Sequence, residues 1–153
     1  LMDWASQLPI IGEVALAMVL GGAIGVEREF ADKPAGFRTH MLVAGAAALL
    51  VGLSAALVAE YAAHPNSDLL RFDPVRVVEA IITGVSFLGA GTIFRRSETN
   101  HVEGLTTAAS ILLAAAVGIS VALRQFALAG AVTGLVLLVL RGMRLIEKWL
   151  STK

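Results

Sequence analysis

The chain has 153 residues and a formal net charge of zero, because 12 basic side chains balance 12 acidic ones. Hydrophobic residues make up 57% of it and charged residues 16%, whereas roughly a quarter of the residues in soluble domains are charged. This composition excludes a basic nucleic-acid-binding surface, the lack of cysteine excludes disulfides and thiolate metal sites, and the hydropathy indicates an integral membrane protein.

Five apolar segments are long enough to cross a bilayer, which requires about 20 residues of helix. They cover residues 8–26, 39–62, 75–94, 105–123 and 126–145. We therefore predict an all-α integral membrane protein with five transmembrane helices.

Small residues recur at a spacing of four in these segments, as in Gly21-xxx-Gly25, Ala114-xxx-Gly118 and Gly130-xxx-Gly134. In lipid such a spacing lets two helices approach closely. We expect helix packing along these faces, a homodimer, and one transmembrane domain over residues 1–153 with no soluble C-terminal domain. The pair Asp73-Pro74 predicts the N-cap and first residue of the third helix.

The basic residues between the segments predict the orientation of the chain. Nine of them fall on one side: Arg28, Lys33, Arg38, Arg95, Arg96, Arg141, Arg144, Lys148 and Lys153. Three fall on the other: Arg71, Arg76 and Arg124. Because cytoplasmic loops carry the excess of lysine and arginine, we predict an outer N-terminus and a cytoplasmic C-terminus in the bacterial inner membrane. Arg141 and Arg144 are placed to snorkel out of the last helix.

A shift of 68 residues aligns the chain with itself without a gap, bringing residues 20–41 over residues 88–109. Gly21 then meets Gly89, Arg28 meets Arg96 and Thr39 meets Thr107. Both copies cross the membrane in the same direction. This predicts a parallel two-helix repeat, made of spans one and two and of spans three and four.

The first hairpin carries charges of both signs between two apolar spans. Its candidate residues are Glu27, Arg28, Glu29, Arg38, Thr39 and His40. Glu27 and Glu29 should point to different sides of the helix, which argues against a carboxylate pair. A structural network of salt bridges, from Glu27 or Glu29 to Arg38, Arg95 or Arg96, would explain the mixed signs. The alternative is a site for an anion or a partner at the start of the second span.

Two carboxylates, Glu13 and Glu79, lie inside apolar spans near the outer end, at similar places in the two repeats. Acidic residues inside a membrane span are functional candidates, because ionised groups are costly there. The structural alternative is a neutralised carboxylate near the interface, for example Glu79 paired with Arg76.

Metal and catalytic signals are sparse. His40, His64 and His101 have no metal-site spacing, so zinc is not expected. Asp32, Glu98 and Glu103 could hold Mg²⁺ loosely through water. The chain has no phosphate-binding loop and no nucleophile motif, so we expect no enzyme, no catalytic residue and no cofactor.

Four motifs resemble the MgtC/SapB family. They are the glycines before "ERE" at residues 27–29, "KPAGFRTHMLV", "GVSFLGAGTIFR" and "VEGLTTAASILLAAAVGI". The resemblance covers residues 16–122. It points to Pro34, Gly36 and the first-hairpin candidates, and in the second hairpin to Gly89, Gly91, Arg95, Glu103, Gly104, Thr106 and Thr107.

The family resemblance implies a bacterial inner-membrane protein linked to growth under magnesium limitation and to virulence inside macrophages. Its members are thought to act on other membrane proteins, notably the proton-translocating ATP synthase, rather than to carry magnesium. Many also have a cytoplasmic C-terminal domain of the ACT type, so a chain ending at Lys153 suggests a short member or a truncated chain.

We therefore expect a non-enzymatic membrane regulator that acts through partner proteins. The alternative is a small ion transporter or channel with Glu13 and Glu79 on the pathway. A purely structural membrane subunit is a third possibility.

Overall fold

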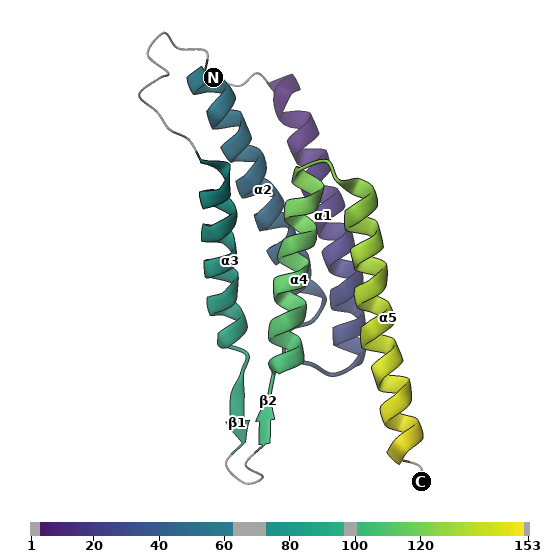
Figure 1. Cartoon of the computed structure of the whole chain (residues 1–153). Coiled ribbons are helices and arrows are strands. Elements are labelled where there is room, and N and C mark those ends of the chain that lie inside the picture. The colour runs from purple at the N-terminus through teal and green to yellow at the C-terminus, as the bar shows by residue number, and fades with distance from the viewer. Residues whose placement is uncertain (1–3, 63–72, 97–100, 152–153) are drawn as a thin grey trace.

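The structure is a computed structural model that describes residues 4–62, 73–96 and 101–151. These residues form five helices and one short antiparallel hairpin: α1 (Trp4–Phe30), α2 (Phe37–Ala62), α3 (Pro74–Ala90), β1 (Phe94–Arg96), β2 (His101–Glu103), α4 (Leu105–Ala122) and α5 (Phe126–Ser151). Figure 1 shows the helices side by side, with consecutive helices running in opposite directions. Helices α1 and α3 finish at the same end of the bundle as α2 and α4 begin. We call this end the network end, after the polar network that is described below.

Four helices, α1, α2, α4 and α5, are long and apolar enough to cross a membrane. The fifth, α3, has 17 residues and corresponds to about 26 Å of helix, slightly less than the roughly 30 Å hydrocarbon core of a bilayer. The helical architecture that the sequence predicts is confirmed. The fifth crossing stays a prediction.

The third helix ends earlier than the sequence predicts, at Ala90 instead of residue 94. Gly89 and Gly91 flank this last residue. The Thr92 hydroxyl donates a hydrogen bond to the Gly89 carbonyl oxygen at 2.7 Å. The chain then continues into β1 and β2, which pair with Arg95 opposite Val102. The sequence shows no strand pattern here, because three-residue strands are too short for a readable alternation.

Polar groups define where two of the helices begin. The Asp73 carboxylate accepts a hydrogen bond from the Val75 N–H at 3.0 Å, which confirms the predicted cap of α3. The start of α2 is capped from the preceding helix, because the Glu29 carboxylate accepts from the Phe37 N–H at 2.8 Å. The turn between α1 and α2 is thereby tied to both helices.

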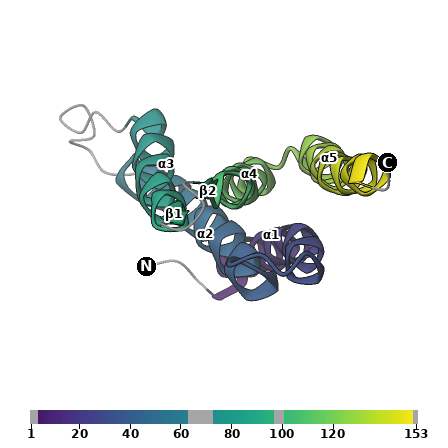
Figure 2. The same ribbon diagram turned by 90° about the horizontal axis from the view of Figure 1, so that it is seen from below.

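The centre of the bundle is formed by α1, α2 and α4, which make the most extensive helix contacts. Figure 2 shows α3 at one edge and α5 at the other. Large apolar side chains, such as Val19 on α1, Phe87 on α3 and Leu138 on α5, remain exposed on the outside. This arrangement suits a surrounding lipid phase, because small residues pack the interior and large apolar ones face outward.

Ala44 on α2 lies where the three central helices approach one another closely. It is fully buried between Gly21 on α1 and Gly118 on α4. A Cβ atom at Gly21 would lie 2.6 Å from the Ala44 Cβ, and one at Gly118 would collide with the Ala44 carbonyl oxygen. The three backbones can therefore meet only because these two positions carry no side chain.

One helix contact recurs at positions that the 68-residue shift pairs. Gly21 lies against the backbone of His40, and Gly89 lies against Ala108, the position that the shift matches to His40. The first pair of helices nevertheless packs more extensively than the second. The recurrence supports the parallel repeat, which stays a prediction.

We predict that Gly118→Ala destabilises the bundle by about 1–3 kcal/mol, because the added methyl group overpacks the contact with α2. Gly12→Ala is the matched control, since nothing lies within 4 Å of a Cβ atom built there. Thermal unfolding in detergent micelles measures both. Equal melting temperatures for the two variants would contradict the packing at Ala44.

Candidate functional site

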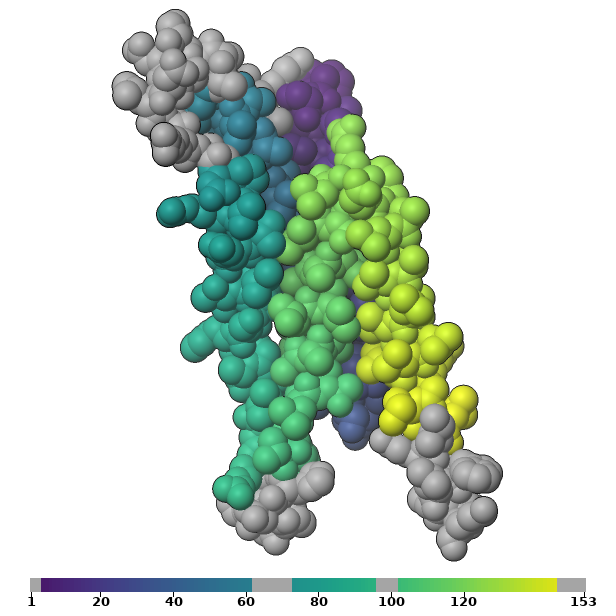
Figure 3. Space-filling model, viewed as in Figure 1, coloured from purple at the N-terminus to yellow at the C-terminus, as the bar shows by residue number. Residues whose placement is uncertain are grey.

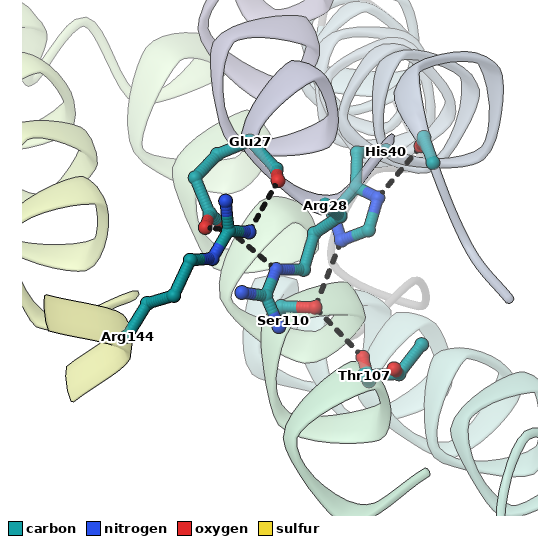
Figure 4. A network of polar contacts seen from close by, with 7 residues as sticks. Glu27, Arg28, His40, Thr107, Ser110 and Arg144 are labelled. Carbon is teal, nitrogen blue, oxygen red and sulfur yellow. Dashed lines mark hydrogen bonds and ion pairs between the residues drawn. The ribbon is translucent and has the colours of Figure 1, made fainter. Parts of the chain in front are cut away.

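A buried polar network occupies the network end of the bundle. We use this name for Glu27, Arg28, His40, Thr107, Ser110 and Arg144. Figure 4 shows them converging from α1, α2, α4 and α5.

Glu27 is the centre of the ionic part of this network. It lies in the last turn of α1 and is only 3% exposed, and the adjacent Arg28 is 4% exposed. The Arg28 Nε donates to Glu27 Oε2 at 2.7 Å. From α5, the Arg144 Nη2 donates to Glu27 Oε1 at 2.7 Å and to the Glu27 carbonyl oxygen at 3.1 Å. Both carboxylate oxygens are thus bound to a guanidinium, and α5 is joined to the end of α1.

His40 forms the second part of the network, between α2 and α4. It is fully buried, with Nδ1 at 2.9 Å from the Gly36 carbonyl oxygen and Nε2 at 2.9 Å from the Ser110 Oγ. A carbonyl oxygen can only accept, so Nδ1 carries a proton. The Ser110 hydroxyl also donates to the Thr107 carbonyl at 2.8 Å. When the imidazole is neutral, Nε2 and this carbonyl therefore compete for one hydroxyl proton.

The structure gathers four of the predicted site residues into this network: Glu27, Arg28, His40 and Thr107. Glu29, Arg38, Thr39, Arg95 and Thr106 lie at the surface instead, and Glu103 is half-buried on β2. The burial of Glu27 and the exposure of Glu29 agree with the prediction that these carboxylates face different sides.

Sequence reasoning misses two members of the network, Ser110 and Arg144. Glu27 pairs with Arg28 and Arg144, whereas the partners predicted from the sequence are Arg38, Arg95 or Arg96. Arg144 is therefore bound to the end of α1 and half-buried there, rather than only snorkelling to the membrane surface. A usable signal exists for Ser110, because it follows Thr107 by three residues and so lies on the same helix face.

The two intramembrane carboxylates lie away from the network and differ from each other. Glu13 on α1 pairs with Arg124 in the turn between α4 and α5, with 3.0 Å between Glu13 Oε1 and the Arg124 Nε. Glu79 is on the exposed face of α3, and Arg76 approaches Asp73 at 4.0 Å rather than Glu79. Glu13 thus has a partner within the same chain, the exposed Arg124, whereas the Glu79 side chain faces outward.

Metal ligands do not cluster in the part of the chain that the structure describes: it contains no group of three or more histidine, cysteine or acidic side chains that could hold an ion. Asp32 is exposed in the first turn, and Glu103 is on β2. Glu98 and His64, also considered from the sequence, lie outside the described residues.

Comparisons with known proteins agree on one family. The MgtC family model matches residues 14–149. The chain is 37% identical over 131 residues to protein MgtC of Salmonella typhimurium, covering 86% of this chain and 51% of that protein. It is 34% identical over 120 residues to protein SapB of Bacillus subtilis, covering 78% of this chain and 50% of that protein.

A third relative is the Escherichia coli protein named "Putative magnesium transporter YhiD", which is 41% identical over 105 residues. That alignment covers 67% of this chain and 46% of the relative. The chain thus spans about half the length of these relatives. No solved structure gives a significant match.

We predict that Glu27→Gln lowers the free energy of unfolding by about 3–5 kcal/mol, because it leaves the buried Arg28 without an anionic partner. The control is Glu29→Gln, whose amide oxygen can still accept from the Phe37 N–H, with an expected loss below about 1 kcal/mol. Denaturant unfolding in micelles measures both variants. A loss at position 27 no larger than at position 29 would contradict the central role of Glu27.

Proposed function

Because the chain belongs to the MgtC family, we propose that it is a non-enzymatic regulator in the bacterial inner membrane. In this proposal it contributes to adaptation to low magnesium and, in pathogens, to virulence, and it acts by contacting other membrane proteins. The proton-translocating ATP synthase is the first partner to test. Since the chain spans about half the length of its named relatives, the proposal concerns its membrane region.

The observation that carries the proposal is that the carboxylates of Glu27 and Glu13 on α1, the first buried and the second partly buried, are bound by arginines. Glu27 is held by Arg28 and Arg144, and Glu13 is held by Arg124. Such pairs hold helices in place, and among the described residues they leave no buried carboxylate without a cationic partner. The exposed groups at the network end, including Arg38 and Arg95, remain available to a partner.

A second candidate function is ion transport, which the name of the Escherichia coli relative favours. In that case Glu13 and Glu79 would line a pathway between the two repeats. The pairing of Glu13 with Arg124 and the outward position of Glu79 favour regulation instead.

We also propose that the protein forms a homodimer. Gly130 and Gly134 lie on the exposed side of α5, and nothing is within 4 Å of a Cβ atom built at either position. The backbone of a second chain could approach closely at these two glycines.

Regulation and transport predict different results for purified protein in proteoliposomes. We expect no Mg²⁺ flux, and therefore no difference between the wild type and a Glu13→Gln, Glu79→Gln double variant. In native membranes, crosslinking with mass spectrometry should recover a partner that is lost in Arg38→Glu. Arg76→Glu is the control, because Arg76 is exposed at the opposite end of the bundle. Flux that disappears in the double variant would establish transport and remove the regulator proposal.

The orientation can be tested with single cysteines, since the native chain has none. The positive-inside rule predicts that the network end faces the cytoplasm. Lys33→Cys should then be protected from a membrane-impermeant maleimide in intact cells, and Gln125→Cys should react. Both positions are exposed, and they lie at opposite ends of the bundle. The reverse labelling pattern would invert the proposed topology.

A further inference from the structure

An apolar groove runs between α4 and α5. Its volume is about 310 Å³, and its walls include Ala109 and Leu113 on α4 and Val132, Val136 and Leu140 on α5. Figure 3 shows α4 in green and α5 in yellow lying side by side on the face in view. An uncovered apolar groove of this kind in a membrane protein is open to lipid.

The groove leads to the buried polar network. Val132, Val136, Leu140 and Arg144 follow one another at intervals of four along α5, so they lie on one side of that helix. Ser110 contributes both to the groove wall and to the network, and Thr106 lines the groove in the first turn of α4. The lining of the groove is almost wholly apolar, and its polar end is the network itself, which lies beyond Thr106 and Leu140.

The polar end carries an excess of positive charge. Within the described part of the chain, two guanidinium groups, Arg28 and Arg144, share the single carboxylate of Glu27. Arg28 uses its Nε for this contact. The Arg28 side chain is only 5% exposed, whereas the Arg144 side chain is 32% exposed, so Arg144 is the guanidinium that a ligand can reach directly. Figure 4 shows Arg28 extending toward Ser110.

The start of α4 adds hydrogen-bond donors at the same end. Its cap residue is Gly104, which has no side chain to bind the first N–H groups, and the first helical bond runs from Ala108 to Gly104. The N–H groups of Leu105, Thr106 and Thr107 therefore have no partner within the helix, and such a helix start favours an anion. Together with Arg28 and Arg144, it makes the polar end complementary to a phosphate.

We propose that the α4–α5 groove binds one anionic phospholipid, with an acyl chain against Leu113, Val136 and Leu140 and the phosphate near Arg28, Arg144 and Thr106. A basic pocket between membrane helices is a recognised setting for anionic headgroups. The net charge favours an anionic over a zwitterionic lipid. One uncompensated positive charge near the membrane surface corresponds to a roughly fivefold preference for the anionic lipid over the zwitterionic one.

The test is native mass spectrometry of the full chain, released from micelles that contain equal amounts of phosphatidylglycerol and phosphatidylethanolamine. We expect one retained lipid per chain, with phosphatidylglycerol favoured roughly fivefold. Ala109→Phe fills the groove and should remove the retained lipid. Ala127→Phe is the matched control, because Ala127 is an exposed alanine on the side of α5 away from the groove, and it should retain the lipid like the wild type.

A second pair of variants tests the charge. Arg144→Gln should reduce the preference for phosphatidylglycerol to near unity, whereas Arg141→Gln, on an exposed arginine one turn earlier, should preserve it. If Arg144→Gln does not fold, the preference of the wild type and the loss in Ala109→Phe decide the question. Equal retention of both lipids, retention unchanged by Ala109→Phe, or a peptide bound in place of lipid would each overturn the proposal. Because no partner protein is present, the result is independent of the proposed regulation.

Discussion

The inner architecture depends on the ion pairs that the Glu27 carboxylate forms. This carboxylate is buried at the end of α1 and is bound by the neighbouring Arg28 and by Arg144 of α5. A buried ion is costly unless its partners replace the water that it loses, and here two guanidinium groups do so. The edge helix α5 thereby acquires a polar anchor in addition to its apolar contacts with α1 and α4.

The packing of the central helices follows a different physical rule. Water does not drive helices together inside a bilayer, so close van der Waals contact has to hold them. Gly21 and Gly118 permit that contact on both sides of Ala44. His40 then joins α2 to α4 through Ser110 just below the tightly packed region. Small residues determine how near the helices lie, and the polar contacts determine which faces meet.

The sequence predicts the helices well because each leaves a local signal. Long apolar runs mark α1, α2, α4 and α5, and Asp73-Pro74 marks the start of α3. Four of the six residues of the polar network are also predictable, since Glu27, Arg28, His40 and Thr107 belong to the hairpins where the charges and motifs concentrate. The pairing of Glu27 with Arg144 is not predictable, because the two residues are 117 positions apart in the sequence. Arg141 lies in the same apolar helix and would be an equally good candidate from the sequence. The β1–β2 hairpin is not predictable for another reason, which is that its strands are too short to show the two-residue alternation of a strand.

The attachment of α5 has a mechanical consequence. Near one end the helix follows the turn at Arg124, which takes up a left-handed conformation with φ of 59°, and near the other end Arg144 holds it to α1. Arg124 and Arg144 are 20 positions apart, so the helix between them forms a lever roughly 30 Å long, and a tilt of about 10° at the turn would carry the guanidinium about 5 Å from the carboxylate. That displacement exceeds the reach of a hydrogen bond. The outer helix should therefore be either docked or released, with little room for a graded intermediate position.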